Sequence, residues 1–121
     1  MVKYMNTSSA RRATRVSQTD RIFRALGTPI RRNMIERLSR HGRMPLSEVA
    51  RPYGISLPAA LKHMHILERG GFVRHEKLGR ARFFSVDRNG FDAAEQWLQS
   101  QRAYWEGSFN RLEALLNKRK K

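Results

Sequence analysis

The sequence predicts a mainly α-helical domain with one small β-hairpin, in the order α-α-α-α-β-β-α. Two observations lead to this prediction. Apolar residues recur at helical spacing in four segments before residue 70 and in one long segment after residue 90. Between them, "FVRHEKLGRARFFSVD" has the pattern of two strands joined at Leu78-Gly79-Arg80. A chain of 121 residues fits one domain of this kind.

Start and stop signals place the first two helices. The first is expected to begin at a cap near Thr19-Asp20 and to stop at Gly27. Thr28-Pro29 pairs a cap residue with proline at the first helical position, and Gly42 ends this second helix.

The remaining helices follow from proline, glycine and serine positions. Pro52 limits the third helix, in "MPLSEVARPYGIS", to about two turns. Gly54 permits a tight turn into Ser56, which caps a fourth helix with Pro58 in its first turn. The last helix is expected from about Phe91 to Leu116.

The charge distribution divides the chain and indicates a polyanionic partner. The formal net charge is +15, from 25 basic and 10 acidic residues. Residues 1–18 are expected to form a basic disordered arm and residues 118–121 a basic tail. The domain between them, residues 19–117, still carries 17 basic and 10 acidic residues. Nucleic acid is the first expected partner and an anionic membrane the second, against the plain alternative of a solvated basic surface.

Composition also excludes several classes of chemistry. The chain has no cysteine, which rules out thiolate metal sites, disulfides and thiol redox reactions. The N-terminal residues show no apolar export signal, and no apolar run approaches membrane-spanning length. The expectation is a cytoplasmic protein without a membrane partner.

A helix, a three-residue turn, a second helix and a basic hairpin follow one another in the order of a winged helix-turn-helix. When residues 57–69 are projected onto a helix, an apolar face and a basic face separate. The inner face holds Ala60, Met64 and Leu67, flanked by Leu57 and Leu61; the opposite face holds Pro58, Lys62, His65 and Arg69, with Ala59 nearby.

The two histidines of this helix test a metal-site alternative. His63 and His65 are two residues apart and point about 200° apart, so they cannot share one ion on a helix. His65 joins the basic face. His63 lies on the border, where a structural role at the rim of the core is favoured.

The hairpin supplies a second basic surface. Gly79 allows a tight tip, where Arg80 and Arg82 are the best candidates for phosphate or minor-groove contacts. Val73, Phe84 and Val86 are expected to face the core. The candidate DNA-contacting residues are Ser56, Leu57, Pro58, Ala59, Lys62, His63, His65 and Arg69 on the helix, and Arg74, Lys77, Arg80 and Arg82 on the hairpin.

The last helix predicts self-association through the terminal helices. A heptad series runs through Phe91, Leu98, Trp105 and Leu112, accompanied by Phe109 and Leu116, and a second stripe holds Trp97, Tyr104 and Leu115. One stripe is expected on the chain's own first helix and the other on a partner; the alternative is that both are internal. The predicted dimer interface comprises Ile22, Phe23, Leu26, Phe91, Trp97, Leu98, Tyr104, Trp105, Phe109, Leu112 and Leu116.

From about Thr19 to Leu116 the chain resembles the ArsR-type winged helix-turn-helix regulators. The segments that carry the resemblance are "IFRALGTPIRRNMIERL", "LSEVARPYGISLPAALKHMHILERGGFVRHEKLGRARFFSV" and "WLQSQRAYWEGSFNRLEALL". Residues of the same type as the family pattern are Ser56, Pro58, Ala59, Lys62, His63, Leu67 and Gly71. Leu61 departs from the pattern, because many relatives have a DNA-facing serine there.

The resemblance implies a homodimer that binds a near-palindromic operator, usually as a repressor. Many members release DNA when a metal binds to cysteines of the third helix or to Asp, His and Glu of the last helix. Here the third helix has no Cys or His, and residues 88–121 contain no histidine. The chain therefore resembles a subgroup without the known metal-ligand motifs. No metal or cofactor is expected, metal sensing elsewhere stays a minor alternative, and the effector is unknown.

Among four classes of function, the sequence favours a sequence-specific, double-stranded-DNA-binding homodimer that represses transcription. The alternative is a non-specific basic protein associated with the nucleoid or RNA, which phosphate contacts alone would support. An enzyme is disfavoured, because the sequence has no Gly-rich phosphate loop and no paired acids in a pocket-forming segment. A protein-interaction module with an inert winged helix is the fourth.

Overall fold

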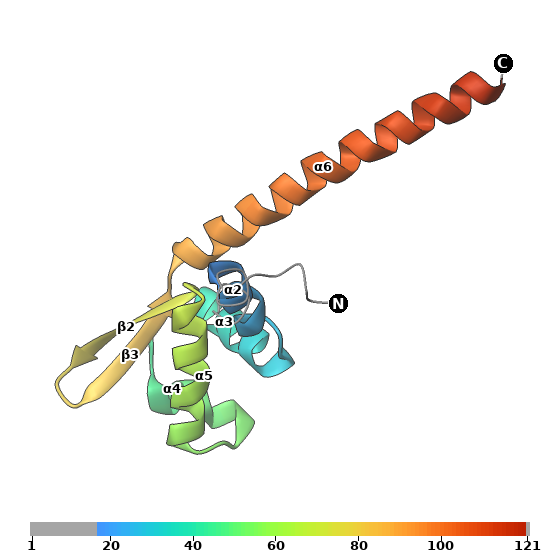
Figure 1. Ribbon diagram of the computed structural model, residues 1–121. Helices are drawn as coiled ribbons and strands as arrows, with labels where there is room; N and C mark the ends of the chain where they lie inside the picture. The colour runs from blue at the N-terminus through green and yellow to red at the C-terminus, as the bar shows by residue number, and fades with distance from the viewer. Residues whose placement is uncertain (1–16, 121) are drawn as a thin grey trace, which may run out of the picture.

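The computed structural model describes residues 17–120 and confirms the predicted order of helices and hairpin (Figure 1). The helices of the domain pack together beside the hairpin, and the last helix leaves the domain as a long rod. The elements are α2 (Gln18–Ala25), α3 (Pro29–His41), β1 (Met44–Pro45), α4 (Leu46–Ala50), the 3₁₀ turn η1 (Arg51–Tyr53), α5 (Leu57–Arg69), β2 (Val73–Leu78), β3 (Ala81–Val86) and α6 (Arg88–Lys120).

Helix α2 begins earlier than the sequence predicted. Its N-cap is Ser17, whose Oγ accepts a hydrogen bond from the Asp20 amide at 3.1 Å, while Asp20 Oδ2 accepts from the Ser17 amide at 3.3 Å. This reciprocal pair is a capping box, so the predicted cap at Thr19-Asp20 was wrong. Most of the predicted arm, residues 1–16, lies outside the described residues, but Ser17 and Gln18 belong to the folded domain.

The predicted caps of α3 and α5 and the predicted end of α3 are confirmed, whereas α2 ends at Ala25, before the predicted stop at Gly27. Thr28 caps α3 with Pro29 at its first position, and Gly42 ends it with a positive φ of 81°. Gly54 adopts the left-handed conformation after η1, with φ of 62°, and Ser56 Oγ then accepts from the Ala59 amide at 3.2 Å to start α5. Local chemistry thus fixes the turn between α4 and α5.

The sheet has three antiparallel strands in the order β1-β3-β2, one more than predicted. In β1, Met44 and Pro45 pair with Phe84 and Phe83 of β3. A two-residue strand shows no alternation in the sequence, and proline is tolerated here because β1 lies at the sheet edge. The hairpin itself turns at Gly79, whose φ is 64°.

The core lies between α3, α5 and the sheet. Its largest fully buried side chains include Phe72, Phe84, Met34, Met64 and Leu67. Burial of each contributes about 1.5–3 kcal/mol. As predicted, Val73 and Phe84 face this core and Val86 packs against it, which fixes the inner face of α5.

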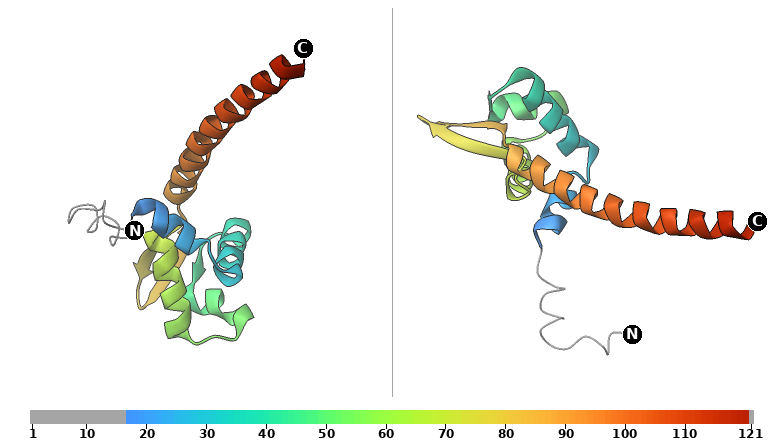
Figure 2. Two further views of the ribbon diagram at one scale, coloured as in Figure 1. Left: turned by 45° about the vertical axis from the view of Figure 1, so that its right-hand side comes forward. Right: turned by 90° about the horizontal axis from the view of Figure 1, so that it is seen from above.

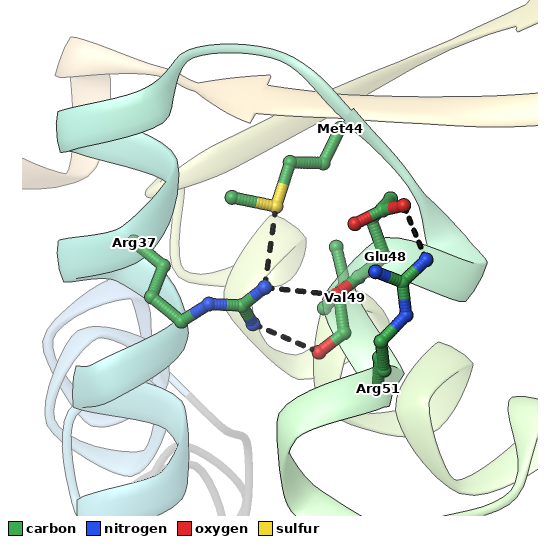
Figure 3. Close-up of polar contacts among 5 residues, drawn as sticks. All are labelled: Arg37, Met44, Glu48, Val49 and Arg51. Atoms are coloured by element: carbon green, nitrogen blue, oxygen red, sulfur yellow. Dashed lines mark hydrogen bonds and ion pairs between the residues drawn. The ribbon is translucent and has the colours of Figure 1, made fainter.

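Arg37 of α3 holds the short helix α4 in place (Figure 3). Its guanidinium donates to the backbone carbonyls of Glu48 at 2.8 Å and Val49 at 3.0 Å, and contacts Met44 Sδ at 3.6 Å. These carbonyls lie at the end of a five-residue helix, where they lack intrahelical partners. A side chain from α3 therefore positions the first helix of the helix-turn-helix.

Helix α6 runs for 33 residues, about 50 Å. Its first part packs on the domain, with Phe91 edge-on to Phe72 at 4.9 Å and Trp97 edge-on to Phe23 at 5.2 Å between ring centroids. Beyond these contacts the helix projects away from the other elements, as all three views show (Figures 1 and 2). It extends past the predicted Phe91–Leu116 at both ends, so residues 118–120 of the predicted tail are helical.

Candidate nucleic-acid interface

Helix α5 presents the two faces that the sequence predicted, with one addition. Ala60, Met64 and Leu67 are buried, whereas Pro58, Lys62 and Arg69 are exposed and Ala59 and His65 are half-buried. Ile66 is also buried, because α2 packs along that side of α5 and covers it. The surface left for a partner is therefore confined to one side and to the N-terminal end of α5.

The β2–β3 hairpin, called the wing from here on, carries uncompensated positive charge at its tip. Lys77 lies directly opposite Arg82 across the hairpin, and Arg80 lies in the turn. Like charges at directly opposite positions destabilise an antiparallel pair. The one acid of the hairpin, Glu76, is paired with Arg43 at 3.0 Å, and this ion pair leaves the tip cations without a partner among the described residues.

The N-terminal end of α5 and the wing meet at a common groove. Its lining includes Leu57 and Leu61 of α5 and Arg80, Ala81 and Arg82 of the hairpin, with Pro45, Leu46 and Ser47 closing it from β1 and α4. The structure thus brings together the predicted residues at the start of α5 and at the wing tip. Arg74 is exposed on the other face of the hairpin, opposite Ser85.

A basic cluster at the opposite end of α5 was not predicted. Arg69 lies 11 residues, or about 16 Å, from Pro58 along the helix axis. There it borders a hollow with Arg21 and Arg24 of α2. The spacing of Arg21 and Arg24 places them on one helix face, but only the packing of α2 on α5 brings them to Arg69.

A buried arginine connects α2, α3 and α5. Arg31 is 7% exposed, and its guanidinium donates to the carbonyls of Arg24 at 2.8 Å and Ala25 at 3.0 Å. Its Nη1 lies 3.2 Å from Nδ1 of His63. Since guanidinium only donates, His63 Nδ1 accepts and the ring is the neutral Nε2–H tautomer. No pattern in the sequence indicates this contact, although helical projection puts His63 at the rim of the core.

The surroundings of His63 disfavour its charged form. Burial lowers the pKa of His63 below its ordinary value, and the positive charges of Arg31 and Lys62 lower the pKa further. The unfolded chain, with an ordinary histidine pKa of about 6.5, then takes up a proton before the folded chain does as pH falls. Stability contributed by neutral His63 is therefore full above pH 6.5 and is lost as pH falls below it.

We expect His63→Asn to reduce this pH dependence, because the Asn amide oxygen can accept from Arg31 but does not titrate. The free energy of unfolding, measured in urea at pH 7.5, 6.5 and 5.5, should fall less steeply in the variant than in the wild type. His41→Asn is the control, because it removes an exposed histidine from α3 and keeps the Arg31 contact. Identical pH profiles for wild type and His63→Asn would contradict the expectation.

Within residues 17–120, no group of three or more His, Asp and Glu side chains lies close enough to hold a metal ion. No helix in this part of the chain is long and apolar enough to cross a membrane.

Helices α4 and α5 in a helix-turn-helix, followed by a basic hairpin, define a winged helix-turn-helix DNA-binding domain. Residues 21–76 match the family model of a helix-turn-helix domain. The HTH-type transcriptional regulator Rv2034 of Mycobacterium tuberculosis is 34% identical over 74 residues, which are 61% of this chain and 68% of Rv2034. The crystal structure of an ArsR family transcriptional regulator is 43% identical, covers 74% of this chain and 91% of its own, and superposes with a TM-score of 0.68. The chain belongs to the ArsR family of winged helix-turn-helix transcriptional regulators, which bind DNA and are not enzymes.

More distant structures share the fold. An ArsR-like transcriptional regulator from Rhodococcus sp. RHA1 is 20% identical, covers 85% of this chain and 94% of its own, and has a TM-score of 0.74. A homodimeric winged helix-turn-helix DNA-binding domain from Mycobacterium bovis is 24% identical, covers 85% and 93%, and has a TM-score of 0.56. The predicted fold class is confirmed by these likenesses.

Proposed function

We propose that the chain is a homodimeric repressor that binds a near-palindromic double-stranded DNA operator through α5 and the hairpin. The observation that carries the proposal is the groove where the start of α5 meets the arginines of the wing tip. A recognition helix contacts base edges with its N-terminal residues, and cations of the wing are placed to contact the flanking phosphates. Arg82 lines this groove, and Lys62 is exposed on α5 at the residue after Leu61.

Within the proposed interface the residues have different tasks. The hydroxyl of Ser56 caps α5, and His63 faces Arg31, so these two chiefly position the helix. Lys62 and His65 lie on the outer face, and Arg69 with the α2 arginines would meet the DNA backbone at the far end of the helix.

The dimer is proposed from the exposed apolar surface of α6. Large apolar side chains are 39–67% exposed along one side of this helix: Phe91, Trp97, Leu98, Tyr104, Trp105, Phe109, Leu112, Leu115 and Leu116. A helix that projects from its domain needs tertiary contacts to be stable, and contiguous exposed apolar surface marks an interaction site. The M. bovis relative with this fold is a homodimer. Ile22 is removed from the predicted interface, because it is 2% exposed within the chain's own core.

A non-specific nucleic-acid-binding function is the second candidate. It is favoured by the net charge of +15 and by the arginine cluster at the far end of α5, both of which act on phosphates regardless of sequence.

Selection from a random duplex pool separates the two candidates. We expect an enriched near-palindrome that binds about a thousandfold more tightly than a scrambled duplex at physiological salt. Lys62→Ala should weaken operator binding about tenfold and leave the dimer intact. Arg88→Ala removes the same charge at the start of α6, where the residue does not line the groove, and should change affinity little. No enriched sequence, with equal affinities and a steep salt dependence, would contradict the repressor proposal.

A further inference from the structure

The start of α5 offers hydrocarbon where a recognition helix usually offers hydrogen-bonding groups. Residues 57–61 are Leu-Pro-Ala-Ala-Leu, and none has a polar side-chain atom. The hydroxyl of Ser56, just before them, accepts from the Ala59 amide as the N-cap of the helix. Within α5 itself the first polar side chain is that of Lys62, in the second turn.

Two of these residues, Leu57 and Leu61, form an exposed apolar patch. Leu57 is 50% exposed, although it is a leucine on a surface bordered by cations. Leu61 lies one turn further along the same helix face, is half-buried, and packs its inner side against the core. Both leucines line the groove beside Arg80 and Arg82, so the apolar patch lies where the wing would hold DNA.

The major groove of DNA presents one apolar feature to such a surface. Donors and acceptors of the bases cannot be recognised by leucine, whereas the C5-methyl group of thymine is recognised by apolar contact. The cations around the groove match the phosphates on either side. A hydrophobic partner protein would not explain the basic border.

We infer that Leu57 and Leu61 recognise thymine methyl groups, so that each operator half-site carries at least one thymine facing the start of α5. The inference rests on the proposed DNA-binding function and adds the chemical basis of its sequence preference. Removing the methyl group should remove the contact and leave every hydrogen-bonding atom of the base pair unchanged.

The test uses the duplex recovered by selection and versions in which each thymine is replaced singly by 2′-deoxyuridine. For the wild type we expect about fourfold weaker binding at one or two positions per half-site, the effect of exposing one buried methyl-sized group. In Leu57→Ala or Leu61→Ala the ratio between thymine and deoxyuridine duplexes should fall to about one at such a position. Lys62→Ala is the matched control, because it should weaken both duplexes equally and keep the ratio.

The possible outcomes separate the inference from the function on which it rests. A selected duplex without thymine in its half-sites, or with equal binding of all deoxyuridine versions, overturns the inference and leaves sequence-specific binding intact. A methyl effect that persists in both leucine variants assigns the contact to other residues and also overturns it. If no sequence is enriched, the proposed function fails and the inference fails with it. Circular dichroism of Leu61→Ala checks that α5 is still folded.

Discussion

Gly90→Ala is expected to lower the free energy of unfolding by about 3 kcal/mol, the cost of overpacking together with a lost hydrogen bond. A Cβ atom at Gly90 would lie 2.6 Å from the carbonyl oxygen of Gly70 and 2.7 Å from the carbonyl carbon of Gly71. These are backbone atoms and cannot rotate away. The Gly90 amide also donates to the Gly71 carbonyl at 2.7 Å, and the shift that relieves the clash breaks this bond.

The same contact determines how α5 is held at its C-terminal end. Gly71 has a φ of 82°, and a Cβ on Gly70 would lie 2.9 Å from the Cβ of Ala25 in α2. The loop after α5 is therefore enclosed between α2 and the start of α6. Separating these backbones would loosen the packing of both α2 and the start of α6. The expected loss of stability is therefore not confined to one contact.

Urea unfolding followed by far-ultraviolet circular dichroism measures the effect, at one protein concentration because self-association raises apparent stability. Gly107→Ala is the matched control. Its Cβ would meet only Arg111 Nη1, at 3.5 Å, on the side of α6 away from the apolar stripe. This change should stabilise the helix by up to about 1 kcal/mol. Equal stability of Gly90→Ala and wild type would show that the backbones separate without cost.

The sequence predicted those features whose causes are local. Thr28-Pro29, Ser56 and Gly54 act within one turn of chain, and each occupies the predicted position. The hairpin and the buried face of α5 follow from periodicity, which reflects burial on one side. These signals were enough to predict the winged helix-turn-helix fold and to predict that α5 and the wing contribute to one surface.

Features produced by packing between distant segments were missed. Arg31 looks like any surface arginine in the sequence, yet it is surrounded by the carbonyls at the C-terminal end of α2 and by the ring of His63. Ile22 was assigned to the dimer interface, and Ile66 was not recognised as part of the core; both are buried where α2 packs on α5. The close approach of Gly90 to Gly70 and Gly71 depends on where α6 begins, which no local pattern determines.

Trp105→Glu is expected to dissociate the proposed dimer and to weaken operator binding by about a hundredfold or more. Trp105 is 56% exposed and lies next to Tyr104 and Phe109, with ring centroids 6.2 and 5.9 Å apart. These residues belong to α6, and the C-terminal part of this helix projects away from the other elements (Figure 2). A second copy would cover them, and a carboxylate buried there without a partner is costly. Two separate monomers lose the gain of binding two half-sites as one unit.

The control must show that the position of the new carboxylate, and not the added charge itself, dissociates the dimer. Ala114→Glu introduces the same carboxylate 180° around the helix from Trp105, on the polar side of α6, and glutamate is a good helix former. Light scattering after size-exclusion chromatography should give a monomer for Trp105→Glu and a dimer for Ala114→Glu and wild type. Titration of the selected operator should then show the loss of affinity in the monomer alone.

A dimeric Trp105→Glu would place the interface elsewhere on the chain. A monomer with undiminished operator affinity would instead separate DNA recognition from dimerisation, because α5 and the wing of one protomer would then be sufficient.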